Sequence, residues 1–312
     1  MDKSTIDSSI SLRPLEQVLS NLSYFSQTSK EKLVSRARFS DVIITNKVEL
    51  DRATLLALPK LKLICITATG TNNVDLQAAK ELGISVYNVN HYSTRSVSQY
   101  VFAMLLEIMQ KTSRYIQDSR DGLWQNSPIF CHFSDPIEEI AEKKLAIIGY
   151  GTLGKAVTKI AQAFGMQVLI AERQGSTTIR ESRVSFEQAI SQADVISVHC
   201  PLTAENHHMF NQHTFSMMKR GAVFINTARG GLVNSEDLYI ALKSKHLKAA
   251  ALDVLETEPP ELDNILLNAK LKNLYVTAHI AWASQQSQQR LIQAVAENIV
   301  GFNNQSLINK VV

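Results

Sequence analysis

Polar and ionisable residues follow four apolar segments in the second half of this 312-residue chain. Each segment is short and almost continuously apolar, which is typical of a strand covered on both faces of a parallel sheet. Ligands bind outside the carboxyl ends of the strands in such sheets, so we expect the residues that follow the strands to gather at one edge. These residues are His199-Cys200-Pro201, Asn226 to Gly231, Asp253 with the nearby Glu256 and Glu258, and His279.

Three of these residues together suit hydride transfer on a 2-hydroxy acid. Arg229 carries a planar guanidinium that can bind a carboxylate through two hydrogen bonds and polarise the adjoining 2-oxo group. His279 can protonate the oxygen as hydride reaches the carbon. Glu258 can orient that imidazole, although Glu256 is a rival for this role. We therefore predict an oxidoreductase site at which a nicotinamide cofactor supplies the hydride.

A glycine-rich loop, residues 149 to 154, supplies the expected cofactor site. It follows a predicted strand and precedes a predicted helix. Gly149 permits the tight turn, Gly151 lets a pyrophosphate approach the backbone, and Gly154 lets helix and strand pack closely. The amino end of the helix offers free N–H groups to the phosphates. We expect this loop, Leu153 included, to bind a dinucleotide.

An acidic residue after the next strand indicates which dinucleotide is bound. Glu172 lies 18 residues after Gly154, where a carboxylate can accept hydrogen bonds from both ribose hydroxyls of an adenosine. The same carboxylate repels a 2′-phosphate, so we predict NAD rather than NADP. Arg173 is the complication, because NADP sites use arginine.

Two regions of the chain alternate strand and helix patterns, which indicates an α/β protein with two doubly wound parallel sheets. We expect strands at 41–45, 61–68 and 84–88 in the first region, and at 144–148, 167–170, 194–198, 222–225, 249–252 and 274–277 in the second. A long helix is predicted from 94 to about 118, irregular chain from 121 to 139, and a last helix over 284–303. The expected domains are 94–284 for the cofactor, and 1–93 with 285–312 for the substrate.

Composition excludes several other classes of protein. Lys and Arg number 32 against 29 Asp and Glu, a net charge of +3 that is too small to favour nucleic acid. No apolar run is long enough to span a membrane. The cysteines, Cys65, Cys131 and Cys200, lack metal-ligand spacing and indicate reduced thiols in a cytoplasmic protein. We expect no metal site, and interpret His207, His208, His213 and His246 as solvated.

The motifs together closely resemble the D-isomer-specific 2-hydroxyacid dehydrogenase family. The resemblance covers nearly the whole chain. Ala171-Glu172-Arg173 and the segment from His279 to Ser284 are most similar to its bacterial glycerate dehydrogenase (hydroxypyruvate reductase) branch. The other matching segments are 69–75, 90–94, 149–154, 199–203, 226–230 and 253–259.

The resemblance implies a Rossmann-type cofactor domain, a flavodoxin-like substrate domain, and a catalytic trio of Arg229, Glu258 and His279. It places Glu258, not Glu256, beside the imidazole. It implies substrate-carboxylate binding at Thr69, Gly70 and Thr71, and a homodimer built on the nucleotide domains with a cleft that closes on substrate. Further cofactor contacts are implied at Cys200, Pro201, Thr227 and Asp253.

The chain departs from the family pattern at several places, among them near Val101 and near Asn206, where family members often carry threonine. Ala278 replaces the usual proline before the catalytic histidine. The chain also begins, at Met1 to Ile6, where relatives end an apolar strand, so we expect the first strand of the substrate domain to be truncated or absent. Its loss would leave neighbouring ladder groups unpaired. The favoured reaction is interconversion of D-glycerate and hydroxypyruvate. The alternatives are another 2-oxo acid such as glyoxylate, an NAD-sensing regulator, or an inactive family member.

Overall fold

The computed structural model describes residues 1–312 and divides the chain into two compact units. The first, here called the discontinuous unit, comprises Met1–Ser93 and Trp282–Val312. The second, called the central unit, comprises Thr94–Ala281. The sequence assigns the chain from residue 285 onward to this unit. In the structure the returning segment begins three residues earlier, at Trp282.

The central unit is built on a six-stranded parallel sheet with the order β5-β4-β6-β7-β8-β9. Beyond β5, Val184 forms a single parallel bridge to Ala171. The chain runs outward from β4 in both directions, so the Rossmann-type crevice is expected at the carboxyl ends of β4 and β6. The strands are β4 (Lys144–Ile148), β5 (Gln167–Ile170), β6 (Val195–Val198), β7 (Ala222–Asn226), β8 (Leu247–Leu252) and β9 (Leu274–Val276).

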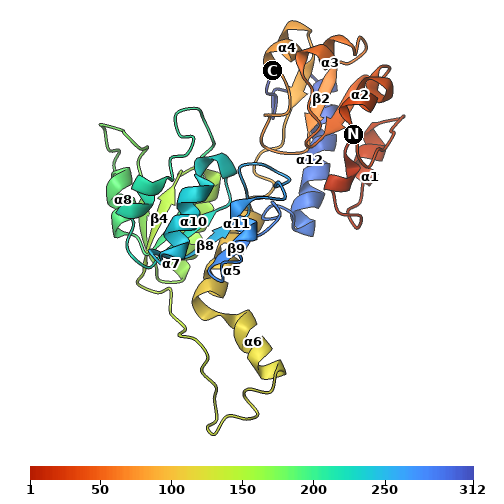
Figure 1. Ribbon diagram of the computed structural model, residues 1–312. Coiled ribbons are helices and arrows are strands. Elements are labelled where there is room, and N and C mark those ends of the chain that lie inside the picture. Colours follow the sequence, from red (N-terminus) through yellow and green to blue (C-terminus); the bar gives the residue numbers. More distant parts are fainter. The chain divides into compact units, whose positions relative to one another are not determined.

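Successive strand residues enter two hydrophobic layers, one on each face of this sheet, because side chains alternate along a strand. Leu145 and Ile147 pack with α5 and α7, whereas Ala146 and Ile148 pack with α8, α9, α10 and α11. Figure 1 shows these helices around the strands. Their bounds are α5 (Thr94–Gln110), α7 (Thr152–Ala163), α8 (Phe186–Gln192), α9 (Gln212–Met217), α10 (Ser235–Lys243) and α11 (Ile265–Asn268).

The prediction of one long helix from residue 94 to about 118 is wrong in one respect, because the structure has two helices there. Helix α5 ends at Gln110, and α6 (Thr112–Arg120) begins after Lys111, whose φ of 52° lies in the left-handed region. The chain then has no helix or strand until β4, and α6 and this segment extend away from the sheet (Figure 1). We call residues 112–139 the arm.

The discontinuous unit contains a three-stranded parallel sheet with the order β1-β2-β3. One face packs against α2, α3 and α4, and the other against α1 and the last helix, α12. The apolar spacing in α12 places Leu291, Val295 and Ile299 in this core. The bounds are β1 (Val42–Thr45), β2 (Leu63–Ile66), β3 (Ser85–Tyr87), α1 (Arg13–Val18), α2 (Lys30–Ala37), α3 (Arg52–Leu56), α4 (Leu76–Glu81) and α12 (Gln285–Asn303).

No strand precedes Ser20, and a short 3₁₀ turn, η1 (Lys3–Thr5), lies near the start of the chain. One carbonyl of β1 and two N–H groups just after the strand nevertheless find partners. The amino group of Met1 donates to the Ile44 carbonyl at 2.9 Å. The Asp2 carboxylate accepts hydrogen bonds from the backbone N–H groups of Asn46 and Lys47, at 2.9 and 2.6 Å. The Met1 amine and the Asp2 carboxylate thus satisfy these three backbone groups.

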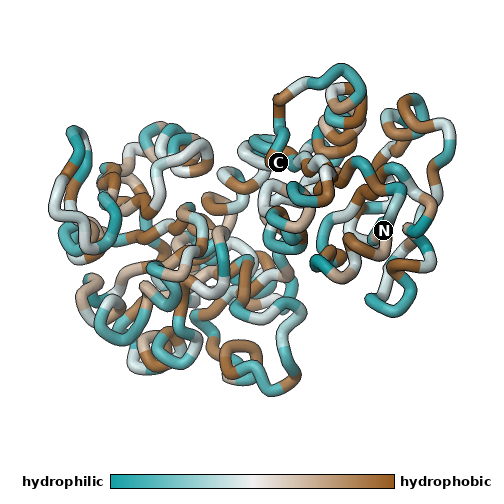
Figure 2. Tube along the Cα trace, turned by 90° about the horizontal axis from the view of Figure 1, so that it is seen from above, coloured by the Kyte–Doolittle hydropathy of each residue, from teal (hydrophilic) through white to brown (hydrophobic).

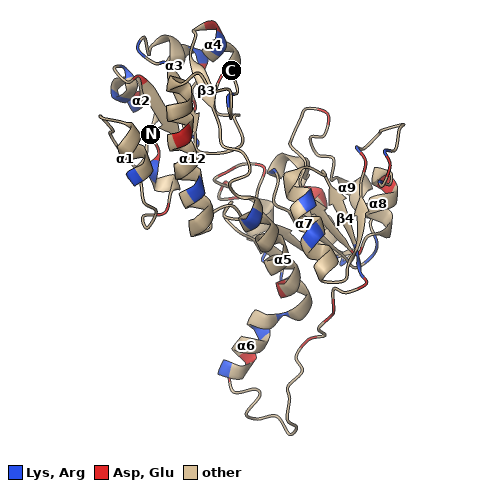
Figure 3. Ribbon diagram, turned by 180° about the vertical axis from the view of Figure 1, so that it is seen from behind, with Lys and Arg blue, Asp and Glu red and all other residues tan.

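Figures 2 and 3 show how hydrophobic and charged residues are distributed along the chain. Hydrophobic residues recur in short stretches between hydrophilic ones along the chain (Figure 2). Basic and acidic residues occur on helices of both units (Figure 3). None of the helices combines the length and apolarity required to cross a membrane. Cys65, Cys131 and Cys200 form no disulfide.

Candidate active site

The glycine-rich loop joins β4 to α7 as the sequence predicts. Gly149 has a φ of +97°, and a Cβ there would lie 2.6 Å from the backbone nitrogen of Cys200. A Cβ on Gly154 would lie 2.3 Å from the Gly149 carbonyl oxygen. Neither position accommodates a side chain. Gly151, the residue before α7, has open space where its Cβ would be, so a phosphate can approach the backbone there.

Two buried polar atoms at the same edge of the sheet have no protein partner. The Thr227 hydroxyl oxygen lies just after β7, and Nδ1 of His199 lies just after β6. Burial lowers the pKa of His199 to about 4, so the ring is neutral, and its Nε2 is 2.9 Å from the Ser197 hydroxyl. Buried polar atoms are normally hydrogen-bonded. A bound dinucleotide offers hydroxyl and amide groups, which can serve as the hydrogen-bond partner that the Thr227 hydroxyl lacks. The residues present therefore fit this cofactor.

Glu172 follows β5 at the position expected for the ribose contact, but it is already paired. Its carboxylate accepts a hydrogen bond from Arg180 Nε at 2.7 Å and from the Arg173 backbone N–H at 3.0 Å. Arg180 also contacts the other carboxylate oxygen, and Arg183 lies 3.8 Å from it. The Arg180 guanidinium lowers the pKa of Glu172 to about 2. The arginine that neutralises Glu172 is thus Arg180, whereas the side chain of Arg173 makes no contact with it.

Glu258 and His279 are in direct contact. Oε2 of Glu258 lies 2.6 Å from Nδ1 of His279. The other carboxylate oxygen accepts a hydrogen bond from the Leu255 backbone N–H at 3.0 Å, which fixes the plane of the carboxylate. Because Nδ1 is bound to Glu258, Nε2 is the ring nitrogen that faces away from the carboxylate. An imidazole oriented by a carboxylate in this way is suited to give and take a proton at Nε2.

Asp253 holds the chain segment that carries His279. Its carbonyl accepts the His279 backbone N–H at 2.8 Å. Its carboxylate accepts hydrogen bonds from the Thr277 hydroxyl at 2.7 Å and from the backbone N–H groups of Ile280 and Ala281 at 2.8 Å. Burial raises the pKa of Asp253 despite these bonds. The φ of His279 is 54°, a conformation that costs about 1–3 kcal/mol for such a residue and persists only where its surroundings impose it.

Arg229 lies in the loop after β7. The Asn226 side chain organises this loop, since its amide donates to the Arg229 carbonyl and its oxygen accepts the Ala228 N–H, both at 2.9 Å. The half-buried guanidinium uses Nη1 to donate to the Ala228 carbonyl at 2.7 Å. A Cβ on the next residue, Gly230, would lie 1.9 Å from the Leu255 carbonyl carbon. The Arg229 loop therefore packs directly against the loop that positions Glu258.

Glu256, the rival for the imidazole partner, is engaged elsewhere. Its Oε1 lies 2.7 Å from Nε2 of His208 and 3.6 Å from Nε2 of His207. The side chains of His207 and His208 are 49% and 31% exposed, but Glu256 gives them a partner that the sequence did not indicate. His246 also has a partner, the Met218 carbonyl at 3.1 Å, and His213 is exposed.

The predicted cofactor residues Gly149, Gly151, Leu153, Gly154, Cys200, Pro201 and Thr227 all lie in loops or helix ends at the carboxyl edge of the central sheet. In the discontinuous unit, residues 69–71 follow β2, and Thr69 donates its hydroxyl to the Val89 carbonyl at 2.8 Å. Sequence reasoning placed Asn226 at this edge without assigning it a role, and it missed Arg180. Asn226 is polar at the end of an otherwise apolar strand, which is a usable signal, whereas Arg180 lies in a loop without any pattern.

Residues 102–281 match the model of the NAD-binding domain of D-isomer specific 2-hydroxyacid dehydrogenases. A glycerate dehydrogenase of Methylorubrum extorquens is 40% identical over 279 residues, which cover 89% of this chain and 88% of that protein. A hydroxypyruvate reductase of Blautia hydrogenotrophica is 38% identical, covering 92% and 89%. The crystal structure of a D-lactate dehydrogenase from Aquifex aeolicus with NAD and lactic acid is similar at a TM-score of 0.79 and 28% identity, covering 95% of each chain.

Proposed function

The chain belongs to the D-isomer-specific 2-hydroxyacid dehydrogenase family, whose cofactor is NAD, and we propose that it interconverts D-glycerate and hydroxypyruvate. The single observation that carries a catalytic role is the 2.6 Å contact between Glu258 and His279. The loop that positions Glu258 also packs against the loop that carries Arg229. The choice of substrate rests on the relatives named glycerate dehydrogenase and hydroxypyruvate reductase.

In the proposed reaction each residue of the trio has one task. The bound dinucleotide would supply a hydride to the 2-carbon in its reduced form, NADH, and would accept one in its oxidised form, NAD⁺. Arg229 binds the substrate carboxylate and draws electron density from the 2-oxo group through its guanidinium N–H groups. His279 delivers a proton from Nε2 to the substrate oxygen during reduction and removes it during oxidation. Glu258 stabilises the protonated imidazole and keeps Nε2 directed away from itself.

The remaining expectations for binding are part of the same proposal. Thr69, Gly70 and Thr71 are assigned to the substrate carboxylate, and the loop of residues 149–154, Cys200, Pro201, Thr227 and Glu172 to the dinucleotide. Asp253 is assigned a positioning role as well, because its hydrogen bonds hold the His279 segment. The three free thiols support a cytoplasmic location, since that compartment is reducing.

The test is an NADH-oxidation assay with hydroxypyruvate, glyoxylate and pyruvate as separate substrates. The highest kcat/KM for hydroxypyruvate supports the proposal, and the highest value for glyoxylate assigns the chain to the alternative reductase. Folded protein that binds NADH but turns over none of the three contradicts the enzymatic role and favours an NAD-sensing one. Replacing NADH by NADPH tests the cofactor preference in the same assay.

We also propose that the protein is a homodimer and that the arm contacts the second copy. Apolar side chains gather on it with little cover: Phe130 is 90% exposed, Phe133 74%, Ile129 57% and Trp124 55%. Large aromatic side chains bury about 150–250 Å² each when covered, and exposed apolar clusters mark interaction sites.

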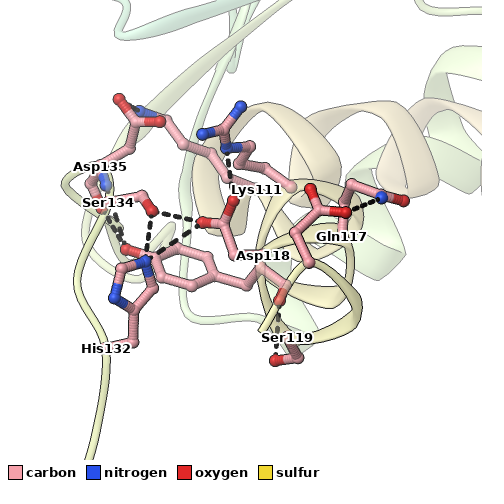
Figure 4. A network of polar contacts seen from close by, with 10 residues as sticks. Lys111, Gln117, Asp118, Ser119, His132, Ser134 and Asp135 are labelled. Carbon is pink, nitrogen blue, oxygen red and sulfur yellow. Dashed lines mark hydrogen bonds and ion pairs between the residues drawn. The ribbon is translucent and has the colours of Figure 1, made fainter. Parts of the chain in front are cut away.

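A polar network keeps the arm ordered (Figure 4). Asp118 is buried and receives hydrogen bonds or ion pairs from Ser134, Arg114 and His132, the last two at 2.9 and 3.5 Å. Asp135 pairs with Lys111 at 3.5 Å. These contacts tie the returning chain to α6, so the apolar surface is preformed and loses little conformational entropy on association.

Light scattering on a gel-filtration column tests the dimer. We expect wild type to have twice the mass of one chain and a Phe130→Ser/Phe133→Ser variant to dissociate toward monomer. Phe39→Ser is the matched control, because Phe39 is also 74% exposed but lies in the discontinuous unit. A dimer that survives the double substitution unchanged removes the arm from the interface.

A further inference from the structure

His207, His208 and Glu256 form a cluster that the proposed dehydrogenase reaction does not use. One nitrogen of each imidazole and one carboxylate oxygen all lie within 4.8 Å of one another. Two imidazoles and a carboxylate are a common ligand set for zinc in proteins, with water completing the coordination. We propose that this cluster binds a divalent transition-metal cation of the Zn²⁺ class, a site beyond the catalytic machinery.

The distances between donor atoms are close to those that a tetrahedral ion requires. Zinc bonds of about 2.0–2.2 Å at tetrahedral angles place neighbouring donor atoms about 3.4 Å apart. Nε2 of His207 lies 3.6 Å from Oε1 of Glu256, which already fits. Nε2 of His208 lies 2.7 Å from the same oxygen, a hydrogen-bond distance that must open by less than 1 Å. The side chains of His208 and Glu256 are 31% and 41% exposed, so the adjustment calls for rotation of side chains that solvent already reaches.

The backbone brings two consecutive histidines to the same side, which neither a helix nor a strand would do. His208 has a φ of 53°, in the left-handed region, and the two rings lie 3.8 Å apart between centroids with a tilt of 32°. The turn is held by the His208 N–H, which donates to the Gly231 carbonyl at 2.9 Å, and by the Asn211 amide, which donates to the His208 carbonyl at 3.1 Å. Both imidazoles are thereby directed at one carboxylate.

Solvent access at the cluster indicates an exchangeable ion rather than a structural one. The side chains of His207, His208 and Glu256 are 49%, 31% and 41% exposed. Three protein ligands leave at least one position for water, and the site needs no folding of its own to form. Nitrogen donors favour Zn²⁺, Co²⁺, Ni²⁺ and Cu²⁺, whereas Mg²⁺ and Ca²⁺ prefer oxygen donors. Mg²⁺ is therefore the negative control.

The test is isothermal titration calorimetry of the full, tag-free, EDTA-treated protein with ZnCl₂, together with the visible spectrum of the Co²⁺ complex. We expect about one Zn²⁺ per chain and the intense visible bands of four-coordinate Co²⁺. The His207→Ala/His208→Ala variant is expected to lose at least about tenfold in affinity, since it lacks two of three ligands. Mg²⁺ is expected to give no binding heat.

His213→Ala is the matched control, because it removes another exposed imidazole of the same unit and is expected to bind Zn²⁺ as wild type does. NADH binding measured on each variant shows that the fold is intact. Equal Zn²⁺ affinity of wild type and the double variant overturns the proposal, as does absence of binding to wild type. Neither result depends on NADH oxidation. The metal-site proposal can therefore be refuted without refuting the proposed reaction, and the reverse also holds.

Discussion

Replacing Glu258 by glutamine tests the core of the proposed mechanism with the least change in shape. Glutamine retains an oxygen that can accept the Leu255 N–H, but it removes the negative charge next to the imidazole. At the observed 2.6 Å, a full charge pair is worth about 1.6 kcal/mol in water and about 6 kcal/mol at an effective dielectric constant of about 20. The two side chains are 29% and 35% exposed, so solvent screening favours the lower half of this interval.

A loss of about 2–3 kcal/mol in stabilisation of the protonated imidazole corresponds to a fall in kcat of about 30- to 150-fold. The assay is steady-state NADH oxidation with saturating hydroxypyruvate, accompanied by NADH binding through its fluorescence. We expect kcat to fall while NADH affinity stays unchanged, because Glu258 is assigned to the proton transfer and not to the cofactor.

Glu261→Gln is the matched control for this experiment. It makes the same chemical change at an exposed glutamate three residues further along the chain, and we expect wild-type kinetics. If Glu258→Gln keeps more than half of wild-type kcat with hydroxypyruvate, the ion pair has no part in proton transfer and the proposed roles of Glu258 and His279 are wrong.

The other predictions concern substrate binding, cofactor choice and thiol reactivity. Arg229→Lys should raise KM as well as lower kcat, because an ammonium cannot make a two-point contact with a carboxylate; an unchanged KM contradicts that contact. Glu172→Ala should reduce the preference for NADH over NADPH by about tenfold or more, since it removes the acceptor for the ribose hydroxyls and frees Arg180 for a phosphate; an unchanged ratio refutes this account. Burial raises the pKa of Cys65 to about 12 and of Cys200 to about 11, so the Cys131→Ser protein should show no reactive thiol toward a disulfide reagent at pH 8 and two after denaturation.

The sheet of the central unit could be predicted because its strands are buried on both faces and read as continuous apolar runs. The expected strand over 144–148 matches β4 and that over 167–170 matches β5, and the others differ from the structure only at their ends. The glycine-rich loop was equally readable, since Gly149 and Gly154 lie where any side chain would collide with backbone. Patterns imposed by steric exclusion and burial are therefore visible in a single sequence.

Features that depend on one unusual backbone angle were not readable. Lys111 interrupts the predicted long helix in a left-handed conformation, without a glycine or proline to indicate a break. His208 adopts the same region and thereby pairs with Glu256, although the sequence around it reads as a polar turn. Non-glycine residues rarely adopt this conformation, so propensity predicts against it and tertiary contacts must impose it.

Asp253 shows how such an imposed conformation can serve the proposed chemistry. Sequence resemblance assigned this residue to the cofactor, yet its carboxylate is occupied by hydrogen bonds from the segment on both sides of His279. Three such bonds, at about 0.5–1.5 kcal/mol each, are enough to offset the strain of about 1–3 kcal/mol at His279. The strained angle fixes where the chain directs the imidazole, and Glu258 then fixes its rotation. The position of the proton donor therefore depends on two carboxylates with separate tasks, one acting on the backbone and one on the ring.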